Sequence, residues 1–204
     1  MTVIAHHLVW TAYGTWLPND PRGSGSTEVY TARLKELGDA HLGRRRVQPP
    51  RRAVREFYAL ATPKLLYEVI RFNAAQIREL GGALAEVLKQ QNYKCFACAI
   101  MPDHVHLVIR KHRHPGEEMI ERLQRGSRLR FSFVYALTHE HPLWTKGGWN
   151  RFLSAPGAVR SRIQYVEDNP VKEGMSRQAW PFVEEYDGWP LHRKTPTRQL
   201  NRKR

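Results

Sequence analysis

The residue types most suited to chemistry gather in the stretch MPDHVHLVI, residues 101–109. His104 and His106 lie two apart in a strand-like run, so their side chains leave the same face, with backbones ~6.6 Å apart. Val105 and Leu107 leave the opposite face, toward the helices expected to cover it. Two imidazoles side by side on an open sheet surface can converge on one metal ion. The alternative is a pair of solvated or stacked histidines.

A second stretch, IQYVEDNPV over residues 163–171, places a phenol and a carboxamide together. Tyr165 and Asn169 are four apart on an expected helix, so they share one face, ~5–6 Å apart at Cβ. The residue before a proline avoids helical geometry, so the helix is expected to end at Asn169, before Pro170. Asn169 could supply a third, hard metal ligand beside the Tyr165 hydroxyl. The alternative is a core tyrosine next to a helix-capping asparagine.

Hydrophobic periodicity and turn signals predict the elements that would position these groups. In chain order they are a strand over 6–11, a helix over 64–91 with a break at Gly81-Gly82, strands over 93–101 and 104–111 joined by a Pro102-Asp103 turn, a helix over 115–137, a short strand over 148–153 and a helix over 156–169. This order predicts an α+β, ferredoxin-like (RRM-like) antiparallel sheet with helices packed on one face and the other face open to a ligand.

The domain organisation follows from the same pass along the chain. One domain is expected over residues 1–190, followed by a basic, flexible tail over 191–204. The basic, proline-interrupted stretch at about 31–63 is interpreted as an insertion or a flexible arm.

The charge balance indicates a polyanionic partner. The chain has 33 Lys and Arg against 19 Asp and Glu, a formal net charge of +14, which favours nucleic acid. Further cations occur at 44–46 and 202–204, and no apolar run reaches the ~18 residues of a membrane span. The candidate DNA-binding cations lie on the helix over 115–137 and just before it: Arg110, Lys111, Arg122, Arg125, Arg128 and Arg130.

The cysteines, the histidines of the first strand and the tryptophans are further candidates for the site. Residues three apart on a strand point to opposite faces, so Cys95 and Cys98 are expected to be structural rather than a metal or redox pair. His6 and His7 lie on the first strand, a candidate neighbour of the site. The six tryptophans could stack unpaired bases, but most are expected in the core and none is assigned.

Two cysteines fit a reducing, cytoplasmic location, and MTVIAHHLVW has no export signal.

Two stretches together, MPDHVHLVI and YVEDNPVKEGM, resemble the single-tyrosine HUH transposases. Asn four residues after the tyrosine resembles the REP-associated tyrosine transposases, whereas the insertion-sequence branch usually has Gln there. The opening HLVWTAYGTWLPNDPRGS also resembles this superfamily, and the resemblance covers roughly residues 6–175. It implies that His104 and His106 are metal ligands, Tyr165 the nucleophile and Asn169 the third ligand. Residues 31–63 exceed the minimal family fold and stay unassigned.

The resemblance implies a metal-dependent endonuclease and strand transferase for single-stranded, hairpin-containing DNA. A divalent cation, Mg²⁺ or Mn²⁺, would neutralise phosphate charge, and the mixed N/O donor set does not choose between them. Tyr165 would attack to leave a 5′-phosphotyrosine and a free 3′-hydroxyl, and the stored bond allows rejoining without ATP. Asp103, Glu167 and metal-bound water are alternative general bases, with Asp103 favoured as a turn residue only. The REP-associated relatives imply a monomer, and the insertion-sequence branch a homodimer.

Two rival functions fit parts of the sequence. A non-catalytic RRM-like module for single-stranded nucleic acid fits the topology and charge, but the chain lacks a clear aromatic RNP run and such a module needs no paired histidines. A zinc protein could use Cys95, Cys98, His104 and His106, but the His-x-His spacing is too short for a zinc finger. Metal dependence would separate these readings.

Overall fold

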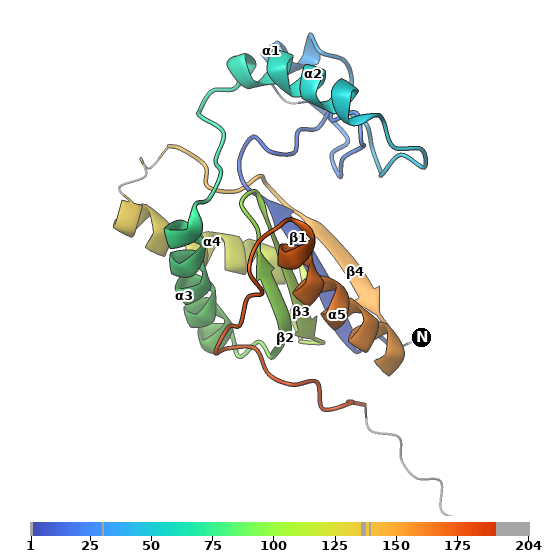
Figure 1. Ribbon diagram of the computed structural model, residues 1–204, viewed down its shortest axis with the longest axis vertical. Helices are drawn as coiled ribbons and strands as arrows, with labels where there is room; N and C mark the ends of the chain where they lie inside the picture. Colours follow the sequence, from blue (N-terminus) through green and yellow to red (C-terminus); the bar gives the residue numbers. More distant parts are fainter. Residues whose placement is uncertain (1, 30, 136–137, 139, 191–204) are drawn as a thin grey trace, which may run out of the picture.

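The computed structural model describes residues 2–29, 31–135, 138 and 140–190. The tail predicted over 191–204, with its cations at 202–204, lies outside these residues. Four antiparallel strands form one sheet in the order β2-β3-β1-β4 (Figure 1). The strands are β1 (Ala5–Thr11), β2 (Cys95–Ile100), β3 (His104–Arg110) and β4 (Trp149–Leu153). This is the ferredoxin-like strand order, so the predicted α+β fold class is confirmed.

The predicted hairpin joins β2 to β3. The backbone N–H of Met101 donates to the carbonyl of His104 at 2.7 Å, which closes a turn over Pro102 and Asp103. Proline and aspartate suit the central positions of such a turn. The hairpin therefore brings His104 to the first position of β3.

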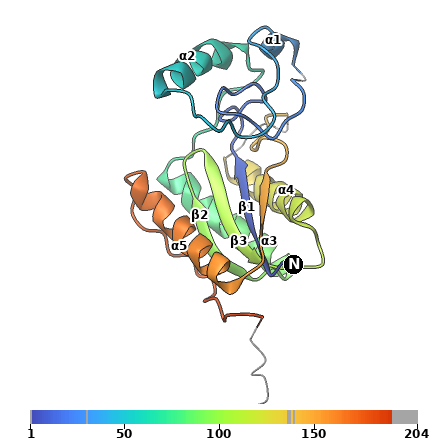
Figure 2. The same ribbon diagram turned by 90° about the vertical axis from the view of Figure 1, so that its right-hand side faces the viewer.

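Each face of the sheet carries its own apolar core. Val105, Leu107 and Ile109 of β3 face α3 (Ala74–Gln91) and α4 (Gly116–Tyr135), as the sequence predicts. The opposite face packs Val108 against Val159 and Val166 of α5 (Pro156–Lys172). The prediction of helices on one face therefore holds for α3 and α4, whereas α5 covers part of the other face (Figure 2). No helix in the described part of the chain is long and apolar enough to span a bilayer.

The helix predicted to start at residue 64 begins ten residues later. Asn73 accepts a hydrogen bond from the Gln76 backbone N–H at 3.0 Å, and the Gln76 side chain accepts from the Asn73 N–H at 2.9 Å. This capping box fixes the start of α3 at Ala74. The apolar residues before it are not helical; the Ile70 N–H instead donates to the Tyr13 carbonyl at 3.0 Å.

The predicted break at Gly81-Gly82 is wrong, because α3 runs unbroken through both glycines. The ring of Trp180 occupies the space that a Cβ at position 81 would need. Gly81 is therefore a packing residue, and its missing side chain admits the tryptophan to the core.

The predicted end of the last helix at Asn169 is also wrong. Pro170 lies inside α5, which continues to Lys172. Pro170 removes one backbone N–H and with it one helical hydrogen bond, but the helix ends at Lys172 and the Met175 N–H closes that end by donating to the Pro170 carbonyl at 2.8 Å. Asn169 thus lies within the last turn of the helix.

The two cysteines do not point to opposite faces. A β-bulge between Cys95 and Ala97 shifts the alternation, so Cys95 and Cys98 both enter the core beneath α3 and α4. Both are free thiols, and burial raises the pKa of Cys95 to about 12 and also raises that of Cys98. Burial in an apolar core makes both thiols unreactive, as expected for structural cysteines.

Residues 14–29 and 31–64 form a small lobe, called here the inserted lobe, beyond the end of the sheet where β1 ends and β3 begins (Figures 1 and 2). Its buried centre joins residues from both halves of the segment: Leu17, Val29, Leu34 and Ala61. The lobe contains α1 (Ala32–Lys35), α2 (Arg51–Ala61) and η1 (Thr62–Lys64). The stretch interpreted as an insertion or flexible arm therefore has regular structure and an apolar cluster of its own.

Gly81→Ala is expected to lower the free energy of unfolding by about 1–3 kcal/mol, because the added methyl group collides with Trp180. Gly82→Ala is the matched control, since its Cβ would make only ordinary contacts with the Arg130 guanidinium, to Nη2 at 3.5 Å and Cζ at 3.8 Å. Helix propensity predicts that the control is unchanged or stabilised by up to about 1 kcal/mol. Urea unfolding followed by circular dichroism measures both, and equal effects would contradict the packing role of Gly81.

Candidate functional site

Three imidazoles gather on the sheet face that α5 partly covers. His104 and His106 leave β3 on the same side, with ring centroids 4.8 Å apart. His7 of β1 stacks on His106, with centroids 5.2 Å apart and planes 9° from parallel. The predicted alternation on β3 is thus observed, and the neighbouring strand contributes a third ring.

Hydrogen bonds orient the two β3 histidines through the same ring atom. His104 Nδ1 bonds Asp103 Oδ1 at 2.6 Å, and His106 Nδ1 bonds His7 Nε2 at 3.0 Å. When Nδ1 carries the proton, Nε2 keeps its lone pair. Both β3 histidines can therefore offer Nε2 to a cation, with a second residue fixing each ring.

Burial keeps the inner imidazoles neutral. It is the main cause that lowers the pKa of His7 from 6.5 to about 3, followed by the charges of Arg162 and Arg151. Burial likewise lowers the pKa of His106 well below its ordinary value, with smaller effects from His104 and His7. A neutral imidazole is the form that binds a metal ion.

Asp103 does more than occupy the turn. Burial alone would raise the pKa of its carboxyl, but the hydrogen bond with His104 and the charge of Arg71 lower it below the ordinary value. Arg71 Nη2 lies 3.3 Å from Asp103 Oδ2. The ionised carboxylate therefore links the first histidine to a pocket arginine.

Tyr165 comes to this cluster from α5. Its ring centroid lies 5.9 Å from that of His106 and 6.0 Å from that of His7, and 40% of the residue is exposed. Cations flank the ring: the Arg162 guanidinium is 4.7 Å from its centroid and Lys172 Nζ is 5.5 Å away. The structure thus brings the predicted tyrosine and histidines together.

Asn169 is placed less directly. It is half-buried, and its Nδ2 is buried without a hydrogen-bond partner in the described chain. It does not line the pocket that holds His104, His106 and Tyr165, whereas Glu173, four residues later at the C-cap of α5, does. The role of Asn169 as a third ligand stays a prediction.

The tyrosine and histidines open into a pocket of about 710 Å³ between the sheet, α5 and the inserted lobe. Its walls carry five arginines: Arg22, Arg44, Arg71, Arg151 and Arg162. In the described part of the chain, the ion pairs of this set are Arg22 with Asp20 and Arg71 with Asp103. The charge of Arg151 also lowers the pKa of Arg162, after the larger effect of burial. The pocket therefore presents excess positive charge, suited to an anion.

The predicted DNA-binding arginines of α4 lie across the sheet from this pocket. Arg122 pairs with Glu118 at 2.7 Å, and Arg130 pairs with Glu79 and Glu86. Arg128 donates to the His141 carbonyl at 3.1 Å, and Arg125 is exposed. The structure does not bring these four residues to the histidines.

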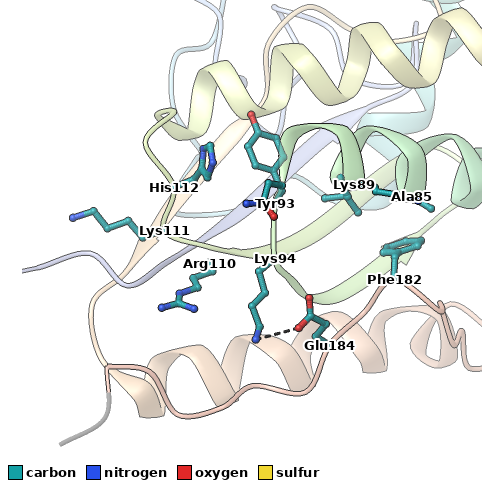
Figure 3. Close-up of a pocket in the computed structure, with 11 residues that line it drawn as sticks. Ala85, Lys89, Tyr93, Lys94, Arg110, Lys111, His112, Phe182 and Glu184 are labelled. Carbon is teal, nitrogen blue, oxygen red and sulfur yellow. Dashed lines mark ion pairs between the residues drawn. The ribbon is translucent and has the colours of Figure 1, made fainter. Parts of the chain in front are cut away.

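Arg110 and Lys111 lie at the far end of β3, about 20 Å from His104 at strand spacing. They line a separate pocket of about 480 Å³ with Lys89, Lys94 and His112 (Figure 3). Glu184 pairs there with Lys94 at 3.1 Å. This pocket is basic but carries none of the three clustered imidazoles, so any DNA contact by Arg110 and Lys111 would lie away from the chemistry.

Sequence reasoning left several pocket residues without a role. His7, Arg151 and Arg162 face the site. Of these, only His7 could have been placed from the sequence, because the apolar residues Leu8 and Trp10 of the same strand alternate with it and enter the core on the opposite face. Arg151 lies directly opposite His7 in the sheet register. The order of the strands had to be known before this neighbour could be found.

The donor set fits a divalent cation in part. Two oriented imidazoles are available, and the described residues hold no cluster of three or more His, Cys, Asp or Glu that would enclose an ion. A site with two protein nitrogens leaves positions for oxygen ligands such as amide, water or phosphate. The Cys-His zinc site considered above does not form, because both cysteines face the other core.

Among the solved structures that are similar to this chain are two with low sequence identity to it. A REP-associated tyrosine transposase bound to a REP hairpin matches at 14% identity and a TM-score of 0.47, over 89% of this chain and 76% of that chain. A candidate transposase from Deinococcus radiodurans R1 matches at 16% identity and a TM-score of 0.36, over 83% and 92%. No family model and no curated protein sequence matches the chain. The roles of individual residues therefore rest on the geometry of this chain.

The buried His7 predicts a dependence of stability on pH. Its pKa is about 3 in the folded chain and near 6.5 when unfolded, so between these values the unfolded state binds the extra proton. The contribution of His7 is therefore present above pH 6.5 and is lost as pH falls toward 3, by ~1.4 kcal/mol per pH unit. Urea unfolding in EDTA should show a shallower pH dependence for His7→Phe than for the wild type. Parallel pH profiles would contradict the buried neutral imidazole.

Proposed function

We propose that this protein is a metal-dependent nuclease and strand transferase for single-stranded DNA, of the transposase kind, with Tyr165 as the covalent nucleophile. One observation carries the proposal: a half-exposed tyrosine faces two oriented histidines inside an arginine-lined pocket. A phosphodiester is an anion with a weakly electrophilic phosphorus, so it needs charge neutralisation, orientation and a nucleophile. This pocket supplies groups for all three.

Arginine is suited to holding the scissile phosphate. Arg151 of β4 and Arg162 of α5 both line the pocket, and the charges of both act on His7. Guanidinium groups bind phosphate oxygens through paired hydrogen bonds. A phosphate held between them would lie within reach of the Tyr165 hydroxyl, which would place phosphorus for in-line attack.

The reaction conserves the number of phosphodiester bonds. The Tyr165 oxygen loses its proton and attacks phosphorus, and the bond from phosphorus to the 3′ oxygen breaks. The electron pair goes to the 3′ oxygen, which takes up a proton and leaves as a 3′-hydroxyl. A 3′-hydroxyl can later attack the 5′-phosphotyrosine, which restores the tyrosine and rejoins DNA without ATP.

His104 and His106 would hold the cation through Nε2, with Asn169 as the expected third ligand. Such a cation, Mg²⁺ or Mn²⁺, supplies charge neutralisation at a non-bridging phosphate oxygen. Asp103 and His7 hold the two rings in orientation.

Three carboxylates of this chain are candidates for the general base. Asp103 already bonds His104 and pairs with Arg71, which supports its role as an orienting residue. Glu167 lines a different pocket, near Arg177. Glu173, at the C-cap of α5, shares the pocket with Tyr165.

Tyr165→Phe removes one oxygen and should abolish the covalent protein–DNA adduct and strand rejoining, while DNA affinity and folding stay unchanged. A denaturing gel with labelled single-stranded hairpin DNA and Mn²⁺ measures the adduct. Tyr135→Phe is the matched control, a tyrosine 37% exposed on α4 that should keep wild-type adduct formation. Adduct at the wild-type level with Phe at 165 would refute the nucleophile. Wild-type DNA binding without any adduct would favour the non-catalytic RRM-like function.

His7→Phe keeps an aromatic ring but removes the nitrogen that bonds His106. Loss of such an orienting partner is expected to weaken Mn²⁺ affinity roughly 10- to 100-fold, as measured by calorimetry. The control is His6→Phe, because His6 is equally buried but bonds Asn150 on the other face of the sheet. Equal Mn²⁺ affinity for wild type and His7→Phe would show that His7 does not orient the ligand.

A further inference from the structure

Trp149 extends the active-site face of the sheet toward its edge. In the register, His106 pairs with Val9 and Val9 pairs with Trp149, so the three residues form one row across β3, β1 and β4. At the usual strand spacing the backbones of His106 and Trp149 are about 10 Å apart. This span is comparable with the reach from a phosphate to the base of an adjoining nucleotide. Trp149 is 40% exposed, although a tryptophan usually buries most of its surface.

The inserted lobe brings a second indole to the same place. The rings of Trp16 and Trp149 meet edge to face, with centroids 5.9 Å apart and planes at 77°. Trp16 Nε1 donates to the Gly23 carbonyl at 2.8 Å, and the Arg22 guanidinium lies 3.9 Å from the ring centroid. Both tryptophans line the pocket that contains Tyr165 and the histidines.

Buried hydrogen bonds hold this part of the lobe in place. Asp20 is fully buried and accepts from Arg22 Nε at 2.9 Å and Nη2 at 2.6 Å. Tyr58 of α2 donates its hydroxyl to the same carboxylate at 2.5 Å. The guanidinium over Trp16 is therefore fixed by a paired charge and by a helix of the lobe.

The lobe also contributes a cation to the pocket. Gly23 adopts a φ of +95°, and a side chain there would collide with the backbone of Gly43. This close approach of two chain segments brings Arg44, the residue after Gly43, to the pocket wall. Arg44 is exposed and free to meet a ligand from the solvent side.

We propose that Trp16 and Trp149 form a stacking subsite for one unpaired nucleobase of single-stranded DNA, next to the phosphate held at the histidines. The subsite rests on the proposed function, and it gives the inserted lobe a role in substrate selection. Stacking on indole accepts any exposed base, whereas bases within a duplex already stack on one another. Arg44 and Arg151 would hold the backbone on either side. The occupant is therefore a single strand rather than a duplex or a neutral peptide.

The test separates base contacts from backbone contacts. Two fluorescein-labelled probes of equal length are used, an oligodeoxythymidylate and its abasic counterpart, with the Tyr165→Phe protein to prevent cleavage. Fluorescence anisotropy should show tighter binding of the thymidylate probe. Trp149→Ala should weaken that binding on the order of 5- to 100-fold and leave affinity for the abasic probe unchanged. Trp149→Phe, which retains a ring, should keep most of the preference.

Phe152→Ala is the matched control on the same strand. Phe152 is 58% exposed but contacts His6 on the other face of β4, so its loss should not alter the preference for bases. Salt titration adds a second criterion. Arg44→Ala should reduce the log–log salt slope by about 0.7, whereas Trp149→Ala should leave the slope unchanged.

Unchanged discrimination between the two probes in a folded Trp149→Ala protein would overturn the subsite. That result would leave the nucleophile assignment standing if the protein with Tyr165 still forms the covalent adduct. Conversely, base preference lost in Trp149→Ala but no adduct with Tyr165 would support the subsite and refute the catalytic function. An equal loss of affinity for both probes would also overturn it, because it would mean that Trp149 supports only backbone contacts.

Discussion

The alternation of side chains along β3 is the constraint on which the site depends. Val105, Leu107 and Ile109 are fully buried beneath α3 and α4, so burial of that face fixes the register of the strand. A shift by one residue would bury two imidazoles in an apolar core and expose three aliphatic side chains. The free energy of core packing therefore holds His104 and His106 on the opposite face.

That opposite face is only partly covered, and the partial covering makes a pocket. Val159 and Val166 anchor α5 to the sheet, and Tyr165, beside Val166, projects to the uncovered part. The inserted lobe closes the same space from the end of the sheet. Three separate stretches of chain thus enclose a region that none of them lines alone.

Charge and burial are distributed differently on the two faces. The α4 arginines Arg122 and Arg130 are neutralised by carboxylates of α3 and α4, as in a solvated helical surface. In the pocket, burial and then the charge of the nearby Arg151 lower the pKa of Arg162. An anion bound there would relieve the repulsion between the two guanidinium groups. His7 and His106 stay neutral because protonation there would add further positive charge to a buried site.

The amino-acid sequence was enough to predict the strand alternation that pairs His104 with His106, the tight turn before it and the helical spacing around Tyr165. These features depend on residues that are close in the chain, and local backbone geometry governs them. The prediction misplaced the start of α3 and the end of α5, and it wrongly placed a helix break at Gly81. The helix cap, the packing of Gly81 on Trp180 and the tolerance of Pro170 all depend on the surrounding structure. The hydrogen bond from His7 to a residue 99 positions away and the contact between Trp16 and Trp149 could be found only in the folded chain. Such contacts depend on strand order and on the packing of distant segments, which no local pattern encodes.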